Sequence, residues 1–483
     1  MLFNSIDFAI FLPIVFVLYW FVTNKNLKLQ NLLIVVSSFI FYGWWDWRFL
    51  FLMVGSASVD FVVGILLSKQ ENKSKRKTYL SFSIIANLGI LAFFKYFNFF
   101  ADNFVNAFTL IGTKLNPVSI QIVLPVGISF YTFQALSYTI DVYRKKLEPT
   151  KSIIDYFAFI SFFPQLVAGP IERATNLLPQ FYKKRHFDYS KAVDGLRQIL
   201  WGLFKKIVIA DNCAQFANQI FNNFHDYSGY TLIMGAIFFA FQIYGDFSGY
   251  SDIAIGTARL FGFQIMRNFA FPYFSRDIAE FWRRWHISLS TWFRDYLYIP
   301  LGGSKGGTLL KIRNTFVIFI VSGFWHGANW TFIIWGMLNA IYFLPLLLAN
   351  KNRKNIEIVA QGKYLPNIKE FFQISITFGL TVIAWIFFRA DNVEHAFEYI
   401  QQIIIGVIQS PTALLIVCQT YKKVIFLIII FLIIEWFGRE QQYAIEKIGL
   451  KWYKPIRLSM YYLIVLSIFY FMGQEQPFIY FQF

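Results

Sequence analysis

Long apolar stretches separated by short basic segments run along most of the 483-residue chain. A helix that crosses a lipid bilayer needs about 20 mostly apolar residues. Windows of this kind occupy residues 6–22, 29–45 and 49–67, and they recur to the end of the chain. We therefore predict an all-α polytopic membrane protein with roughly ten to thirteen membrane helices and re-entrant segments. The pattern favours a single integral-membrane domain that covers residues 1–483.

Charge follows the same pattern, because the basic residues lie mainly in the loops. The net charge is +17, and loops such as 69–77, 144–151 and 351–363 are rich in lysine and arginine. In a soluble protein this excess would indicate nucleic acid, but cytoplasmic loops of membrane proteins carry it as a rule. We predict no nucleic-acid partner. The start of the chain has no basic region before its apolar run, so we expect a retained first span.

Several apolar windows contain polar residues that lipid would not tolerate. Residues 118–144 hold Ser129, Thr132, Gln134, Ser137, Tyr138, Thr139 and Asp141. Such side chains are expected to face protein or a water-filled cavity. Pro164, Gly169 and Pro170 predict a broken helix in the next window. Asp246 and Asp252 also interrupt an apolar run. Three roles are open for these aspartates: catalysis, pairing with an arginine, and helix capping.

The segment from Glu280 to Trp330 is the most unusual part of the chain. Its first part, residues 278–299, predicts an amphipathic helix at the membrane interface, within a cytoplasmic region of about residues 267–313. The two faces of this helix are expected to carry Trp282, Trp285, Leu289 and Trp292 on one side and Arg283, Arg284, Thr291 and Arg294 on the other. The arginines Arg283, Arg284 and Arg294 are candidates for binding cofactor phosphates or for anchoring the helix to lipid headgroups.

Two histidines of this segment are candidates for chemistry. His326 follows Arg313 by 13 residues, about 20 Å along a helix, which predicts a position inside the bilayer. Gly323 and Gly327 flank it and permit close packing or a break. A neutral buried imidazole suits a general base, although it can also be a packed polar residue. His286 belongs to the interfacial helix, where catalysis, substrate contact and simple packing are all open.

Other chemistries find no support in the sequence. The chain has no Gly-rich nucleotide loop, no metal-ligand cluster and no Gly-x-Ser-x-Gly elbow. Its two cysteines, Cys213 and Cys418, form neither a disulfide framework nor a metal spacing. We therefore predict no metal, no P-loop ATP site and no serine acyl-enzyme.

The stretch EFWRRWHISLSTWFRDYLYIPLGG followed by SGFWHGANWTFIIWG resembles the membrane-bound O-acyltransferase (MBOAT) superfamily. ISFYTFQALSYTIDVYR, FFPQLVAGPIER and DFSGYSDIAIG fit the same family, most closely the bacterial subgroup of alginate and peptidoglycan O-acetylation proteins. The resemblance implies a ring of helices around a central catalytic funnel. It also implies that His326 is catalytic and that His286 lies near the cytoplasmic entrance.

The resemblance further implies an acetyltransferase in the bacterial inner membrane that uses acetyl-CoA as the acyl donor. Arg283, Arg284 and Arg294 are expected near the phosphates of acetyl-CoA, with His326 as base or transient acyl carrier. The expected partners are the bilayer, an extracytoplasmic acetyltransferase as acceptor protein and an alginate-like polysaccharide or peptidoglycan. Two alternatives stay open: D-alanyl transfer from a carrier-protein thioester, and a proton-coupled transporter or flippase. The chain shows no inverted repeat of the transporter kind.

Overall fold

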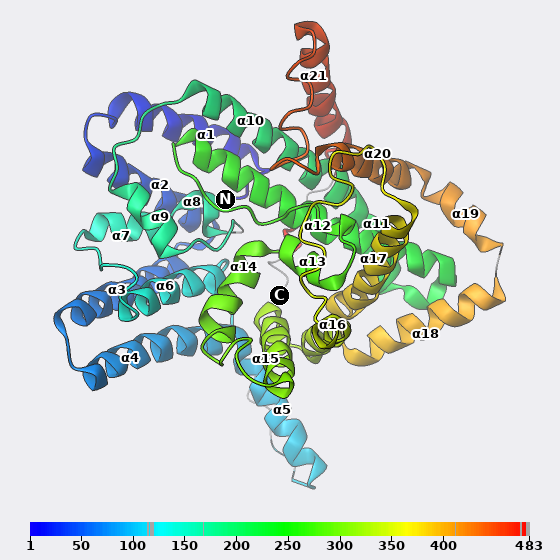
Figure 1. Cartoon of the computed structure of the whole chain (residues 1–483), viewed down its shortest axis with the longest axis horizontal. Helices are drawn as coiled ribbons and strands as arrows, with labels where there is room; N and C mark the ends of the chain where they lie inside the picture. Colours follow the sequence, from blue (N-terminus) through cyan, green and yellow to red (C-terminus); the bar gives the residue numbers. More distant parts are fainter. Residues whose placement is uncertain (114, 116–119, 168, 411, 474–475, 480–483) are drawn as a thin grey trace. The chain divides into compact units, whose positions relative to one another are not determined.

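The structure is a computed structural model that describes residues 1–483 except 114, 116–119, 168, 411, 474–475 and 480–483. The described residues are helical and contain no β-strand, which confirms the all-α prediction. Figure 1 shows the helices in the order of the chain. They form two compact units, one of residues 1–192 and 257–266 and one of residues 193–256 and 267–483. That residues 1–483 act as a single domain stays a prediction.

The first unit is built from helices of very different length. They are α1 (Ile6–Val17), η1 (Leu18–Val22), α2 (Leu27–Asp46), α3 (Arg48–Lys69), α4 (Lys73–Leu91), η2 (Ala92–Tyr96), α5 (Phe97–Leu110), α6 (Ile128–Tyr143), α7 (Ile153–Ile160), α8 (Phe163–Leu166) and α9 (Ala174–Phe181). The predicted windows 29–45 and 49–67 match α2 and α3. The basic loop at 69–77 is shorter than predicted, because Asn72 caps α4 and the lysines from Lys73 onward are helical.

Helix α6 confirms the expectation that its polar residues face protein. All seven polar residues predicted in this window are buried, although residues 118 and 119 of the window lie outside the described part. Asp60 of α3 shows how they are satisfied. Its carboxylate accepts hydrogen bonds from Ser83, from Asn87 Nδ2 at 2.8 Å and from Thr139 Oγ1 at 2.7 Å. Three helices, α3, α4 and α6, are therefore joined through one buried carboxylate.

The second unit contains the remaining helices. They are α10 (Tyr189–Leu203), η3 (Phe204–Ala210), α11 (Asp211–Asn222), η4 (Phe224–Asp226), α12 (Gly229–Leu260), η5 (Pro272–Phe274), α13 (Ile278–Arg284), α14 (Ile287–Phe293), η6 (Arg294–Tyr298), α15 (Thr308–His326), α16 (Trp330–Leu348), α17 (Ile368–Arg389), α18 (Val393–Gln409), α19 (Ala413–Thr420), α20 (Lys422–Gly438) and α21 (Lys454–Phe471). The first four residues of α10 and the last four residues of α12 belong to the first unit.

The two acids of α12 have partners, as the sequence required. Asp246 meets Lys206 Nζ at 2.9 Å, and Asp252 meets Lys205 Nζ at 2.6 Å. Both lysines come from η3, so the partners are lysines and not the predicted arginines. Each ion pair is buried, which is the condition under which a charge inside an apolar unit is tolerated.

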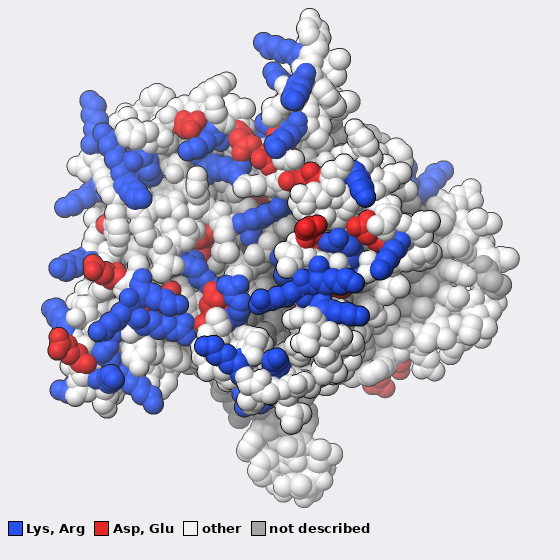
Figure 2. Space-filling model, viewed as in Figure 1, with Lys and Arg blue, Asp and Glu red and all other residues white. Residues whose placement is uncertain are grey.

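Seven helices of the described chain are long and apolar enough to cross a membrane, or eight if the bent pair α18 and α19 forms one span. They include α2, α3, α12, α15, α16 and α17. These helices support a multi-pass membrane protein, and the predicted number of ten to thirteen segments is not confirmed. Figure 2 shows lysine and arginine in excess of acidic residues on one face, in keeping with the net charge of +17.

Candidate functional site

His326 ends helix α15 at the turn of a helical hairpin. The chain reverses through Gly327 and Asn329, and Asn329 Oδ1 accepts the Thr331 backbone N–H at 3.0 Å to cap α16. Helices α15 and α16 pack closely over their length (Figure 1). A Cβ atom on Gly323 would collide with the carbonyl oxygen of Phe332, so the glycine is needed for this approach. The predicted close packing at Gly323 is confirmed.

The imidazole of His326 lies in an aromatic enclosure and is only 4% exposed. Its ring centroid is 4.9 Å from that of Trp325, 5.2 Å from that of Trp335 and 5.3 Å from that of Phe388, each met edge to face. Trp335 and Phe388 come from α16 and α17. The three rings leave the imidazole little contact with water, and a neutral imidazole is the form that can take up a proton.

His286 does not lie in a continuous interfacial helix, and that prediction is wrong. Helix α13 ends at Arg284, His286 adopts a left-handed φ of 43°, and α14 begins at Ile287. The break turns Leu289 and Trp292 out of register with Trp282, so the predicted stripe does not exist as one face. His286 is 1% exposed and is not a surface residue. Local periodicity could not reveal a break held by tertiary contacts.

Asn268 holds this break in place. Its side-chain oxygen Oδ1 accepts the Ser288 backbone N–H at 3.3 Å and the Ser288 hydroxyl at 2.9 Å, and it lies 3.1 Å from His286 Nδ1. The Ser288 backbone N–H can only donate a hydrogen bond, so the Asn268 side-chain atom that it meets is the amide oxygen and not the amide nitrogen. The proton therefore sits on Nδ1 of His286, and Nε2 carries the lone pair. Burial lowers the pKa of His286 to about 3, which keeps the ring neutral.

The two histidines share one indole. The ring centroid of Trp325 lies 4.9 Å from that of His326 and 6.2 Å from that of His286. The sequence placed one histidine at the membrane surface and the other inside the bilayer. The structure instead brings both into one buried cluster, with Phe247 of α12 packed on His286 at 4.7 Å.

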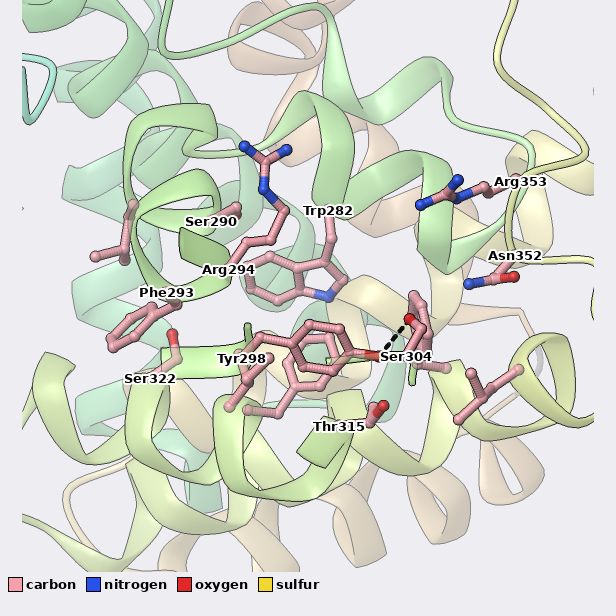
Figure 3. A pocket seen from close by; sticks show the side chains of 15 residues that line it. Trp282, Ser290, Phe293, Arg294, Tyr298, Ser304, Thr315, Ser322, Asn352 and Arg353 are labelled. Atoms are coloured by element: carbon pink, nitrogen blue, oxygen red, sulfur yellow. Dashed lines mark hydrogen bonds between the residues drawn. The ribbon is translucent and has the colours of Figure 1, made fainter. Parts of the chain in front are cut away.

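Beside this cluster lies a cavity of about 230 Å³ (Figure 3). Its walls include Trp282, Phe293, Arg294, Tyr298, Ser322 and Arg353. Ser322 is one helical turn before His326 on α15. The indole of Trp282 packs 5.6 Å from Trp335, which in turn packs on His326. Trp282 and Trp335 thus connect the cavity wall to His326, and the cavity combines an apolar wall with two guanidinium groups.

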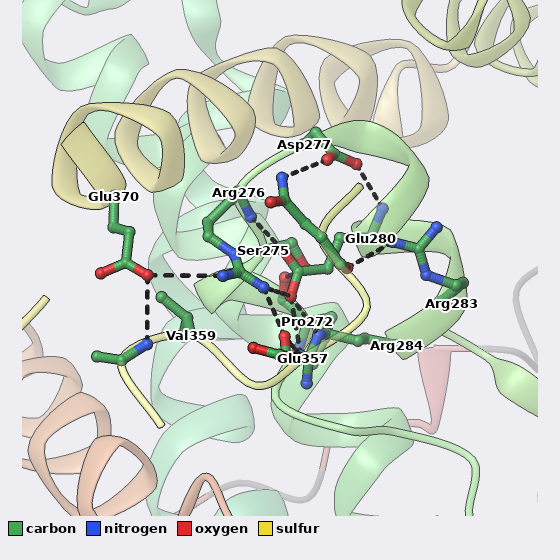
Figure 4. A network of polar contacts seen from close by, with 12 residues as sticks. Pro272, Ser275, Arg276, Asp277, Glu280, Arg283, Arg284, Glu357, Val359 and Glu370 are labelled. Atoms are coloured by element: carbon green, nitrogen blue, oxygen red, sulfur yellow. Dashed lines mark hydrogen bonds and ion pairs between the residues drawn. The ribbon is translucent and has the colours of Figure 1, made fainter. Parts of the chain in front are cut away.

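The three predicted arginines have different surroundings. Arg283 donates to the carbonyl oxygens of Asn352 and Asn355, each at 2.7 Å. Arg284 pairs with the buried Glu280 at 2.8 Å, and Arg276 joins the same carboxylate at 3.0 Å (Figure 4). Only Arg294 lines the cavity, with a side chain that is 59% exposed and paired with Asp295 at 2.8 Å. Two of the three thus hold the fold together.

Sequence reasoning missed two residues of this region. Arg353 lines the cavity, but its position in a basic loop at 351–363 indicated only a cytoplasmic surface. Asn268 gave no signal, because a single asparagine 18 residues before His286 has no recognisable spacing. Among the described residues no group of three or more His, Cys, Asp or Glu side chains could hold a metal ion.

These features define a multi-pass membrane protein with a buried histidine cluster. The family model described as MBOAT, membrane-bound O-acyltransferase family, matches residues 145–388, which include both histidines and Arg294. The chain belongs to this family and is an O-acyltransferase.

Three relatives show how far the similarity extends. The chain is 37% identical over 503 residues to a probable alginate O-acetylase of Pseudomonas putida, which covers 100% of both chains. It is 36% identical over 430 residues to a peptidoglycan O-acetyltransferase of Helicobacter pylori, covering 83% of this chain and 79% of the relative. Similarity to a teichoic acid D-alanyltransferase of Streptococcus thermophilus is lower, at 28% over 323 residues, with 60% and 75% covered.

Proposed function

We propose that the protein takes an acetyl group from cytoplasmic acetyl-CoA and passes it across the bacterial inner membrane for O-acetylation of an extracytoplasmic polysaccharide. The observation that carries this proposal is the pair of buried histidines, His286 and His326, around one indole beside a cavity with two guanidinium groups. The names of the similar proteins point to alginate and peptidoglycan as polymers. The immediate acceptor in this proposal is a separate extracytoplasmic acetyltransferase.

His326 is the general base of this proposal. Its neutral imidazole takes the proton of the acceptor hydroxyl while the hydroxyl oxygen attacks the thioester carbonyl carbon. The C–S bond then breaks, and the CoA thiolate leaves and takes up a proton. The aromatic enclosure supports this role, because it excludes water that would hydrolyse the thioester. A transient acyl group on His326 is the alternative route.

His286 contributes a second neutral imidazole. Its Nδ1–H donates to Asn268 Oδ1, so Nε2 is the ring nitrogen that can act as an acceptor. We assign it to orienting one of the two substrates and not to proton abstraction. The hydrogen bond to Asn268 supports this assignment, since an orienting group must itself have a fixed direction.

The cavity is the proposed site of the donor. Guanidinium groups bind phosphate through charge-assisted hydrogen bonds, and Arg294 and Arg353 are the cations of its wall. The apolar wall of Trp282 and Phe293 suits the uncharged arm of the donor. Contact of Arg283 and Arg284 with acetyl-CoA stays a prediction, because their described partners are carbonyl groups and Glu280.

Labelled acetyl-CoA tests the proposal in membranes that contain the protein. We expect label in the polysaccharide and release of free CoA, and a loss of at least about 100-fold in both for His326→Ala. His225→Ala is the matched control, since that imidazole is 70% exposed. Full acetylation by a folded His326→Ala protein would contradict the assignment. Transfer from a D-alanyl carrier-protein thioester and none from acetyl-CoA would support the alternative donor.

A further inference from the structure

A second cavity, of about 310 Å³, lies in the first unit, where η1 ends and the loop at 182–188 passes. Four of its lining residues are basic by nature: Lys25, Lys184, Arg185 and His186. No aspartate or glutamate lines it. The proposed acyl-transfer chemistry makes no use of these residues.

Arg185 is the buried member of this group, with 7% exposure. Its described partners are neutral: Nη2 donates to Gln30 Oε1 at 3.0 Å and to Asn31 Oδ1 at 2.5 Å, and Nη1 donates to the Gln180 carbonyl at 3.3 Å. Its Nε–H is buried and meets no acceptor in the described part of the chain. Burial lowers the pKa of this guanidinium, and the nearby Asp155 carboxylate, which accepts a hydrogen bond from Asn31, acts in the opposite direction.

The other cations surround an apolar wall. Lys25, Lys184 and His186 are exposed, and none of them forms an ion pair or a side-chain hydrogen bond with a described residue. The wall includes Phe16 and Phe21, and Phe21 is 75% exposed. Basic groups at the end of an apolar membrane segment are placed at headgroup level.

We propose that this cavity binds the phosphate headgroup of an anionic phospholipid, with the acyl chains along the apolar surface of α1 and η1. The phosphate meets Lys25 and Lys184 at the rim, and the buried Arg185 adds a third positive charge to the cavity wall. The basic side chains explain the preference for an anion, and the phenylalanines explain the preference for a lipid over a free phosphate. The site is independent of acetyl transfer.

Native mass spectrometry of the purified full chain tests the proposal. The protein is equilibrated with equal amounts of phosphatidylglycerol and phosphatidylcholine, and the retained lipids are counted. We expect preferential retention of phosphatidylglycerol. The double variant Lys25→Gln, Lys184→Gln is expected to lose this preference by a factor on the order of 20, because each lysine at an anionic surface contributes roughly a factor of five.

The double variant Lys73→Gln, Lys77→Gln is the matched control, since it removes two exposed lysines of the same unit outside the cavity. It should keep the preference. Equal retention of the two lipids by the unmodified protein, or an equal loss in the control, would overturn the proposal.

Inorganic phosphate and CoA, added to the protein in phosphatidylcholine nanodiscs, separate the possible sources of the phosphate. Calorimetry measures whether either compound binds. If one of them binds the unmodified protein but not the double variant Lys25→Gln, Lys184→Gln, the cavity takes a soluble ligand and the lipid proposal is overturned. Because neither lysine has a described partner, these variants are not expected to unfold the chain, whereas Arg185 variants would lose buried hydrogen bonds.

Discussion

At the scale of single residues, one hydrogen bond decides what His286 can do. The ring is neutral, its Nδ1 is directed to Asn268, and the orientation of Asn268 is set by the Ser288 backbone. Asn268 Nδ2 donates in turn to Ser251 at 3.3 Å. Asn268 also lines a small pocket, whose charged and titratable lining residues are Lys205, Tyr244, Asp252, Arg267, Glu435 and Tyr443.

Replacing Asn268 tests whether it positions His286. Asn268→Ala frees the ring and should lower acetyl transfer by at least about tenfold, as loss of a tautomer-fixing partner does elsewhere. Asn268→Asp keeps an oxygen at Nδ1 but adds a charge that stabilises the imidazolium. The acidic limb of the pH–rate profile should therefore move to higher pH in Asn268→Asp.

Ser251→Ala is the control for the two Asn268 variants, because it removes only the hydroxyl that accepts the hydrogen bond of Asn268 Nδ2. It should leave the acidic limb where it is. A merely structural role of Asn268 would lower the amount of folded enzyme in all variants and leave the limb unmoved, which would contradict the positioning role.

The neutrality of His286 also has a consequence for stability. Its pKa in the folded protein, about 3, lies below the ordinary value of 6.5. The unfolded chain therefore binds the proton first, so the contribution of this residue to stability is complete above pH 6.5 and decreases as the pH falls toward 3. We expect the loss of melting temperature between pH 7.5 and pH 5 to be smaller in His286→Gln than in the unmodified protein. An equal loss in the two proteins would contradict this prediction.

At the scale of elements, the hairpin of α15 and α16 positions His326. Both helices are apolar and long enough to span a membrane. What holds them together is close backbone contact at glycine: a Cβ on Gly323 would meet Phe332, and one on Gly336 would meet Phe319. Small residues at such contacts are typical of packed helices in membranes.

Gly336→Ala should separate the hairpin and lower stability by roughly 1–3 kcal/mol, as overpacking does. Acetyl transfer should fall with it, because Trp335 beside it packs on His326. Thermal unfolding in detergent measures the effect. Gly379→Ala on α17 is the control, since nothing lies within 4 Å of its would-be Cβ. Equal melting temperatures of the two variants would show that the glycine contact is not limiting.

At the scale of the whole molecule, residues distant in sequence meet around α12. The segment 476–479 is the clearest case: the Ile479 backbone N–H donates to Asp246 at 2.7 Å, and Lys206 donates to the Gln476 carbonyl at 3.1 Å. Phe478 is fully buried, 4.3 Å from Tyr250 and 6.1 Å from Phe247 between ring centroids. Phe247 is also the ring that packs on His286.

Phe478→Ala should therefore weaken both the fold and the site. We expect a loss of roughly 3–5 kcal/mol of stability, the usual cost of deleting a buried phenylalanine, and a decrease in acetyl transfer through the loosened Phe247. Tyr470→Ala, at a side chain that is 79% exposed, should change neither. Unfolding and transfer assays on the two proteins measure the difference, and an unaffected Phe478→Ala enzyme would exclude this role of the segment.

The sequence by itself determined the class of protein. Helices α2, α3 and α17 can be predicted as membrane spans from the length and apolarity of their own residues. This prediction needs no knowledge of the helices that pack against them. It also required buried partners for Asp246 and Asp252, because an isolated charge in an apolar segment is too costly. His326 was predicted as a functional candidate because a polar side chain in an apolar segment is also costly. Its catalytic role is part of the proposed function.

Only the tertiary structure decided the arrangement around the histidines. The left-handed turn at His286 is held by an amide from Asn268, 18 residues away, and the helical periodicity of residues 278–299 does not encode such a contact. The shared indole of Trp325, the cavity that admits Arg294 but not Arg283, and the burial of Phe478 against α12 likewise depend on contacts between distant elements. Local patterns report burial and period, whereas the direction of a side chain depends on the packing of the chain around it.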